Sequence, residues 1–138
     1  GFLTEHWLDQ PDPGFVFENR SLIKYRLIVD EFGGWDLFQT LLTTVKALAD
    51  KHGVSMSAVA ARYVLDQPQV GAVIIGARYA HHLPQTLSIF ELSLDPDDYA
   101  ALEAVLAQRH GPSGYVYELE RDRTGRHGSI MKYNLNAL

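Results

Sequence analysis

Residues 70–78 read VGAVIIGAR, and this stretch decides the fold that the sequence predicts. It is a short apolar run that follows the turn signal at Pro68 and stops at Gly76. Such a run between helical segments is typical of a central strand, buried on both faces, in a parallel sheet. One strand leaves its own backbone N–H and C=O groups unpaired. The segment therefore needs neighbouring strands from another copy, another polypeptide or the rest of a larger sheet.

The end of this predicted strand is the first candidate binding site. Gly76 permits close approach of a ligand to the backbone, and a helix N-terminus that follows it favours anions. Arg78 carries a planar guanidinium suited to phosphate. One interpretation is a phosphate grip for a nucleotide cofactor, and the other is an ordinary strand–helix turn with a surface arginine. The spacing alone favours the second, because the motif is weak.

Composition limits the class of protein. The 138 residues are enough for one domain with a real core, and 46% are hydrophobic. The formal net charge of -5 argues against non-specific binding of nucleic acid. No apolar run approaches the roughly 20 residues that span a bilayer, and no signal peptide is evident. Cysteine is absent, which fits the cytoplasm or a soluble organelle interior. The first residue is Gly1, so we expect a processed or partial product.

Apolar spacing and capping residues predict several helices. The first covers residues 22–32, after a possible cap at Ser21, and ends at a glycine pair. The second covers residues 37–51, with Asp36 and Gln39 resembling a capping box. The third is capped by Ser55 and stopped by Pro68.

Two more helices follow the predicted strand. Residues 81–91 are expected to be helical, with three apolar side chains pointing inward: Leu83, Leu87 and Phe90. The last helix begins with the acids of residues 95–98 and ends near residue 109. These acids could suggest calcium, but helix capping explains them more simply. His81 and His82 are adjacent, so on a helix they point about 100° apart, which is poor geometry for one metal ion.

Aromatic residues gather in two regions. In the early part they either wall a substrate pocket or make core contacts beneath a long loop; they are Trp7, Phe15, Phe17, Phe32 and Trp35. Residues 113–138 mix both charge signs and are expected to form an extended tail over a surface or a partner. Three tyrosines of this tail could anchor an interface: Tyr115, Tyr117 and Tyr133.

Four segments, in their order and spacing, resemble the C-terminal part of an aldo-keto reductase. They are residues 1–4 (GFLT), residues 54–65 (VSMSAVAARYVL), residues 73–78 (VIIGAR) and residues 94–98 (LDPDD). The resemblance implies an α/β fold, the C-terminal portion of a (β/α)₈ TIM barrel. This chain would be mostly helical with one barrel strand. Residues 1–112 would be the barrel part, and residues 113–138 a C-terminal tail.

The resemblance also implies a cofactor, NADP(H), and the residues that bind it. The backbone at one end would lie along the pyrophosphate: Gly1, Phe2, Leu3 and Thr4. A second set would hold the adenosine 2′-phosphate: Ile75, Gly76, Ala77 and Arg78. His82, Gln85 and Thr86 would lie near that phosphate and the adenine. The family usually has Asn at the position of Thr86 and often Glu at that of Gln85; the side chains present here can still hydrogen-bond. The family's catalytic Asp, Tyr, Lys and His precede Gly1, so no catalytic residue is assigned in this chain.

Three functions are therefore open. In the first, the chain supplies cofactor-binding elements to an NADP(H)-dependent oxidoreductase that reduces carbonyls to alcohols. Its partner would be the missing N-terminal barrel part or another copy, and its substrate a small carbonyl compound. In the second, it is a non-catalytic assembly subunit that kept the end of a reductase fold. In the third, it is a stable fragment of a cut enzyme.

Overall fold

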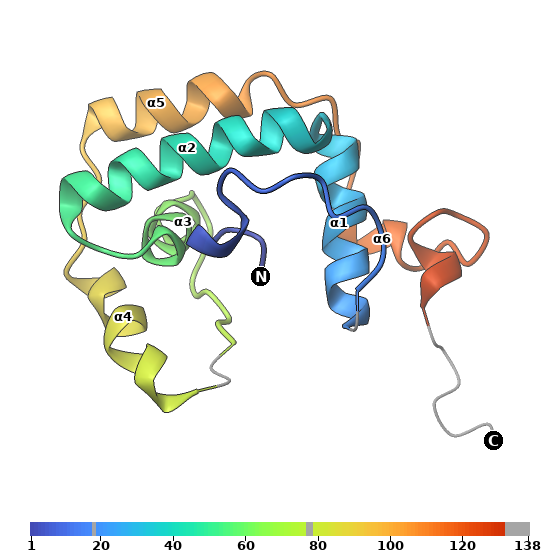
Figure 1. Cartoon of the computed structure of the whole chain (residues 1–138), viewed down its shortest axis with the longest axis horizontal. Coiled ribbons are helices and arrows are strands. Elements are labelled where there is room, and N and C mark those ends of the chain that lie inside the picture. Colours follow the sequence, from blue (N-terminus) through green and yellow to red (C-terminus); the bar gives the residue numbers. More distant parts are fainter. Residues whose placement is uncertain (18, 77–78, 132–138) are drawn as a thin grey trace.

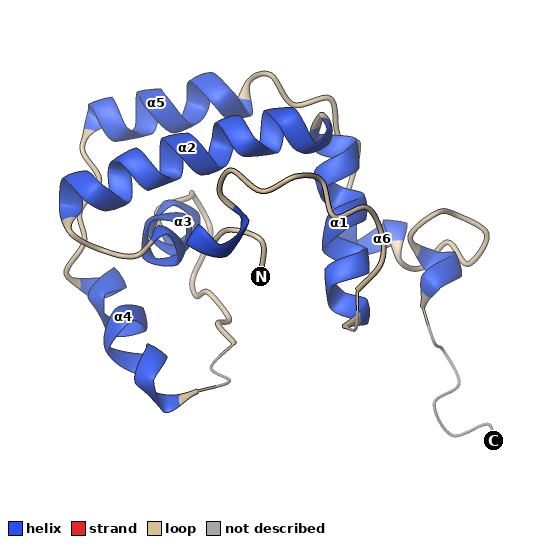
Figure 2. Ribbon diagram, in the orientation of Figure 1, coloured by secondary structure: helices blue, strands red, loops and turns tan. Residues whose placement is uncertain are grey.

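The structure is a computed structural model, and it describes residues 1–17, 19–76 and 79–131. The described residues form helices and loops, with no strand among them (Figure 2). The longer helices are α1 (Arg20–Phe32), α2 (Gly34–His52), α3 (Met56–Leu65) and α5 (Pro96–Leu106). The shorter ones are η1 (Glu5–Trp7), η2 (Ala80–His82), α4 (Leu83–Leu87), η3 (Ser88–Phe90), α6 (Val116–Leu119) and η4 (Gly128–Ile130). Among the helices described, none has both the length and the apolar character needed to cross a membrane.

Helix α2 is the centre of the packing. Figure 1 shows α5 alongside α2, with α3 beneath it and α1 meeting its N-terminal end. Every third or fourth residue of α2 is buried: Trp35, Phe38, Leu42, Val45, Leu48 and Ala49. These side chains meet Phe2, Met56, Val59, Leu92, Leu94 and Leu102 in one hydrophobic core. The strongly periodic helix that the sequence predicts is therefore the one that organises the fold.

The corner between α1 and α2 depends on glycine. Gly33 has φ +149°, and a Cβ atom there would lie 2.5 Å from Leu37 Cδ2. The prediction that the glycine pair ends the first helix is confirmed. The second helix begins at Gly34, earlier than expected, so the capping box at Asp36 and Gln39 was wrong. Gly33 is the N-cap, and the Gln39 side chain bonds to the N-terminal loop instead.

Ser21 was wrong as the cap of α1, because the Asn19 side chain caps that helix by accepting from Ser21 N. The predicted caps at the starts of α3 and α5 are confirmed. The Ser55 hydroxyl accepts a hydrogen bond from Ala58 N at 3.2 Å. Asp95 Oδ1 accepts from the backbone of Asp97 and Asp98 at 3.0 Å each. Helix α5 ends at Leu106, before the predicted residue 109, since the chain then turns so that His110 N can donate to Phe32 O at 2.9 Å.

The predicted strand is not formed. Residues 71–76 have no regular secondary structure, and Ile74 is fully exposed at 101%. A strand exists only when its backbone pairs with another, and the described part of this chain offers helices alone. The mostly helical character of the prediction is confirmed, and the one barrel strand is not confirmed among the described residues.

The segment after this stretch is also less regular than predicted. Residues 80–90 form η2, α4 and η3 in succession instead of one helix. Leu83, Leu87 and Phe90 were expected to point inward, yet Leu87 is 60% and Phe90 75% exposed. The spacing of these residues predicts an apolar face, but it does not show whether other residues of this chain bury that face. We call Ile74, Leu83, Leu87 and Phe90 the uncovered apolar set.

The C-terminal part runs beside α1. Helix α6 and the segment leading to η4 lie next to α1 at the right of Figure 1. Tyr115 and Tyr117 are exposed, and Tyr133 lies outside the described residues.

Candidate functional site

Residues 1–4 are held in place by the buried Phe2 side chain and by hydrogen bonds. Phe2 is buried in the core, and its ring lies 4.8 Å from the Trp7 ring and 6.0 Å from the Phe38 ring. Trp7 Nε1 donates to the Gly1 carbonyl at 3.2 Å, and Thr4 N donates to Phe2 O at 2.9 Å. Leu3 is half-buried and packs against the same core. This stretch is therefore fixed on α2, and the Gly1 carbonyl is already engaged.

The second predicted set is only partly described. Ile75 and Gly76 lie in the exposed segment, and a Cβ atom at Gly76 would meet nothing within 4 Å. Ala77 and Arg78 lie outside the described residues. The predicted phosphate grip thus remains a prediction.

The third set lies on the short helical stretch that follows. His82 and Gln85 are exposed and Thr86 is half-buried. The Thr86 hydroxyl donates to His82 O at 3.1 Å, so its hydrogen is used within α4. The His81 and His82 rings lie 4.1 Å apart, and Tyr79 stacks on His81 at 5.5 Å. Among the described residues, no group of three or more His, Cys, Asp or Glu is placed to hold a metal ion.

The structure does not join these sets into one closed site. Residues 1–4 are anchored on α2, whereas His82, Gln85 and Thr86 lie at α4, at the lower left of Figure 1. Within the described chain, no hydrogen bond links the first set to the other two. Whatever brings them around one ligand must come from outside the described residues.

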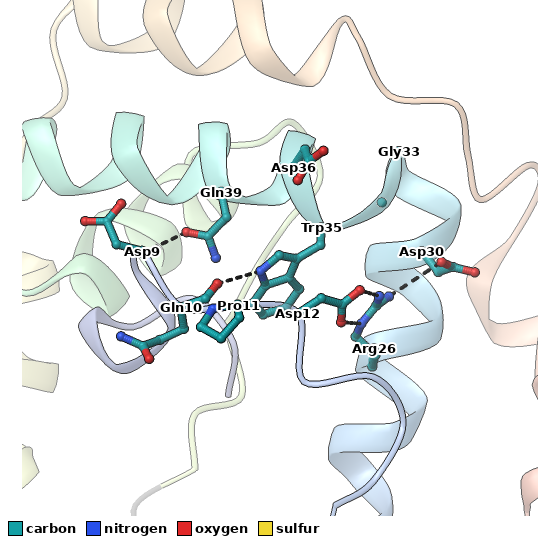
Figure 3. A pocket seen from close by; sticks show the side chains of 11 residues that line it. Asp9, Gln10, Pro11, Asp12, Arg26, Asp30, Gly33, Trp35, Asp36 and Gln39 are labelled. Carbon is teal, nitrogen blue, oxygen red and sulfur yellow. Dashed lines mark hydrogen bonds and ion pairs between the residues drawn. The ribbon is translucent and has the colours of Figure 1, made fainter.

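A pocket that the sequence did not reveal lies at the N-terminal end of α2. It has a volume of about 650 Å³ and is formed by residues 9–12, by α1 and by α2 (Figure 3). Gln39 is its organiser: Oε1 accepts from Asp9 N at 2.9 Å, and Nε2 donates to Trp7 O at 2.8 Å. Trp35 Nε1 donates to Gln10 O at 2.8 Å. These bonds fix the loop across the helix.

The charges of this pocket centre on Arg26, which is 3% exposed. Its Nε and Nη2 donate to the two oxygens of Asp12 at 3.1 and 2.5 Å, and Nη1 lies 3.6 Å from Asp30 Oδ1 (Figure 3). The hydrogen bond from Arg26 lowers the pKa of Asp12. Asp9, Asp30 and Asp36 add further carboxylates to the lining. An anionic cofactor phosphate has little to gain here, so the pocket is distinct from the predicted cofactor residues.

The early aromatic residues divide between the two interpretations. Trp7, Phe17 and Trp35 make edge contacts with the buried Phe2 ring or with one another, as core contacts do. Trp35 also lines the pocket. Phe15 lies instead beneath the guanidinium groups of Arg26 and Arg126, 5.0 and 5.4 Å from its ring centre. Whether any of them meets a substrate stays a prediction.

Asp98 is a buried carboxylate outside both sites. Lys51 Nζ lies 2.6 Å from Oδ1, His52 Nε2 2.7 Å from Oδ2, and Asp95 N donates to Oδ2 at 2.9 Å. Burial opposes ionisation, but these hydrogen bonds outweigh it and lower the pKa of Asp98 to about 2. With both oxygens engaged by its own chain, the group joins α2 to α5 and completes the capping box of α5.

Comparison with known proteins gives one finding. The family model described as "Aldo/keto reductase family" matches residues 1–107. Comparisons with curated proteins and with solved structures gave no match.

Proposed function

Because the chain belongs to the aldo/keto reductase family, we propose that it acts in an oxidoreductase that uses NADP(H) to reduce small carbonyl compounds to alcohols. The observation that carries this proposal is the family match over residues 1–107, which includes every residue that the resemblance assigned to the cofactor. The bound nicotinamide would supply the hydride.

The chain's own part in this reaction is to hold the cofactor. The backbone of residues 1–4 would follow the pyrophosphate, and residues 75–78 the adenosine 2′-phosphate. Two observations at η2 and α4 support this part: His82 and Gln85 are exposed, and the side-chain amide of Gln85 makes no hydrogen bond within the described chain. Thr86 would approach the adenine. We assign no catalytic role in this chain, and the proposal places the catalytic residues in barrel parts that precede Gly1.

The proposal also names the partner of the uncovered apolar set. The rest of a (β/α)₈ barrel would pair with the backbone of residues 71–76 and cover Leu83, Leu87 and Phe90. What supports this is the exposure of Leu83, Leu87 and Phe90, which lie on the consecutive short helices α4 and η3 and are 47, 60 and 75% exposed. A second copy of the chain is the alternative source of the missing strands.

Arg78 tests the cofactor assignment. In the protein reassembled with the N-terminal barrel part, Arg78→Ala should weaken NADPH binding by about 10- to 100-fold, the cost of a charge-assisted contact. NADH, which lacks the 2′-phosphate, should bind as before. Titration followed by nicotinamide fluorescence measures both. The matched control is Arg121→Ala, which removes the same charge from an exposed tail residue.

Two results would contradict the proposal. If the reassembled protein neither binds NADPH nor reduces any carbonyl compound, the reductase assignment fails. If it assembles and still binds no cofactor, the chain is a non-catalytic subunit. An equal effect of Arg78→Ala on NADPH and NADH would reject the role of Arg78 alone.

A further inference from the structure

The C-terminal part is attached to α1 by polar side-chain contacts at three points. Lys24 Nζ and Glu120 Oε1 lie 2.9 Å apart, and His127 Nε2 lies 2.8 Å from Glu31 Oε1. Arg126 pairs with Asp30 between them. The three α1 residues follow one another along the helix, so the segment of residues 113–131 runs beside it, as Figure 1 shows.

Apolar burial contributes little to this attachment. Tyr115, Val116 and Tyr117 are all exposed, and Tyr115 is 84% exposed. Among the described residues that pair with α1 side chains, His127 is buried, Glu120 is half-buried and Arg126 is exposed. Ion pairs at an exposed surface are individually weak and are screened by salt. The segment is therefore held reversibly, unlike the helices that share the core.

Arg126 of the C-terminal part also reaches Phe15, in the loop that leads from the pocket to α1. Two guanidinium groups lie over the Phe15 ring, that of Arg26 at 5.0 Å and that of Arg126 at 5.4 Å from its centre. Asp30 lies between the same two arginines, 3.6 Å from Arg26 Nη1 and paired with Arg126. Arg26 in turn holds Asp12 of the loop. A continuous chain of contacts thus runs from the tail, across α1, to residues 12–15.

We propose that residues 113–131 form a salt-sensitive strap, docked on α1, and that the docked strap orders the loop of residues 9–17 at the pocket. When the strap is released, Phe15 loses one of its two cations and Asp30 loses one of its two partners. The loop of residues 9–17 then opens more often. Because residues 9–12 form one wall of the pocket, that wall opens with the loop. This inference does not depend on the proposed reductase function.

Hydrogen exchange followed by mass spectrometry on the whole chain tests the link between strap and loop. Arg126→Gln should speed amide exchange in residues 9–17 by about two- to fivefold, the change expected from losing one exposed pair. The matched control is Arg121→Gln, since the Arg121 guanidinium lies on Tyr117 within the strap itself. It should leave residues 9–17 unchanged.

A charge swap tests the docking itself. Lys24→Glu and Glu120→Lys should each speed exchange in residues 113–131, and the double variant should restore the original rate. Raising the salt from about 0.1 M to about 1 M shortens the Debye length from about 10 to about 3 Å and should mimic the single variants.

Several outcomes would overturn the strap. Unchanged exchange in residues 9–17 of Arg126→Gln would do so, as would an equal effect of Arg121→Gln. If the double variant does not restore protection from exchange in residues 113–131, docking through the Lys24–Glu120 pair is wrong. Complete exchange of residues 9–17 in the unaltered chain would show that the loop is not ordered by anything.

Discussion

At the scale of single residues, Asp98 is a buried carboxylate at the junction of α2 and α5. It is 1% exposed and holds Lys51 and His52 of α2 against the start of α5. The pKa of Asp98 falls from 3.8 to about 2 in the folded chain. A carboxyl whose pKa is depressed by folding stabilises the protein above its unfolded pKa. That stability should be lost as the pH falls from about 4 to about 2.

Asp98→Asn should therefore destabilise the chain by about 2 kcal/mol near neutral pH, because Lys51 and His52 lose the buried carboxylate that they contact. Urea unfolding followed by circular dichroism measures this. The difference from the unaltered chain should shrink between pH 4 and pH 2, the window set by the two pKa values. Asp97→Asn, one residue earlier and exposed, is the control and should cost about 0.5 kcal/mol. Equal effects of both variants would contradict this role of Asp98.

Sequence patterns could indicate some of these residues but not their partners. The acids of residues 95–98 predict a helix start because capping is local, within three or four positions. The contacts of Asp98 with Lys51, of Gln39 with Trp7 and of Arg26 with Asp12 span 14 to 47 positions. No spacing rule connects such pairs. The pocket built on the contacts of Gln39 and Arg26 was therefore not predicted. The sequence indicated only its loop and the aromatic residue Trp35.

At the scale of elements, the one-residue corner at Gly33 sets the angle between α1 and α2. Gly33→Ala should destabilise the chain by about 2 kcal/mol, because alanine is strained at φ +149° and its Cβ meets Leu37. The double variant Gly33→Ala/Leu37→Ala removes the clash and leaves the strain, so a thermal unfolding series separates the two. Gly53→Ala, at φ +64° with open space around it, is the control, at about 1 kcal/mol. A cost at Gly33 no larger than at Gly53 would refute the steric contribution.

The elements also show which predictions sequence can support. Helices α2, α3 and α5 were predicted nearly as they are, because the apolar period of each helix, and the caps of α3 and α5, are encoded within the segment. The apolar run of residues 70–75 predicted a strand from composition, but a strand needs a partner that the described chain does not contain. The inward face expected at α4 failed for the same reason. Both predictions depended on a partner outside the segment, a paired strand in one case and a covering surface in the other, and the segment's own sequence does not show whether that partner is present.

At the scale of the whole molecule, the described chain has one packed side, around α2, and one side that carries the uncovered apolar set. If the rest of a barrel covers that set, a charge placed there should cost the chain nothing and should prevent assembly. Leu87→Asp should change the free energy of unfolding of this chain by about 0.5 kcal/mol or less, since Leu87 is 60% exposed. It should weaken association with the N-terminal barrel part by about 30-fold or more, because burial of one leucine is worth about 2 kcal/mol.

Light scattering with size-exclusion chromatography measures that association. Ala47→Asp places the same charge on the exposed face of α2 and should leave assembly unchanged. Association that survives Leu87→Asp would mean that the barrel part binds elsewhere. If Leu87→Asp instead unfolds this chain by itself, then α4 is covered from within, and its apolar side chains do not await a partner. The two free energies, of unfolding and of assembly, therefore assign this surface independently of any measurement of activity.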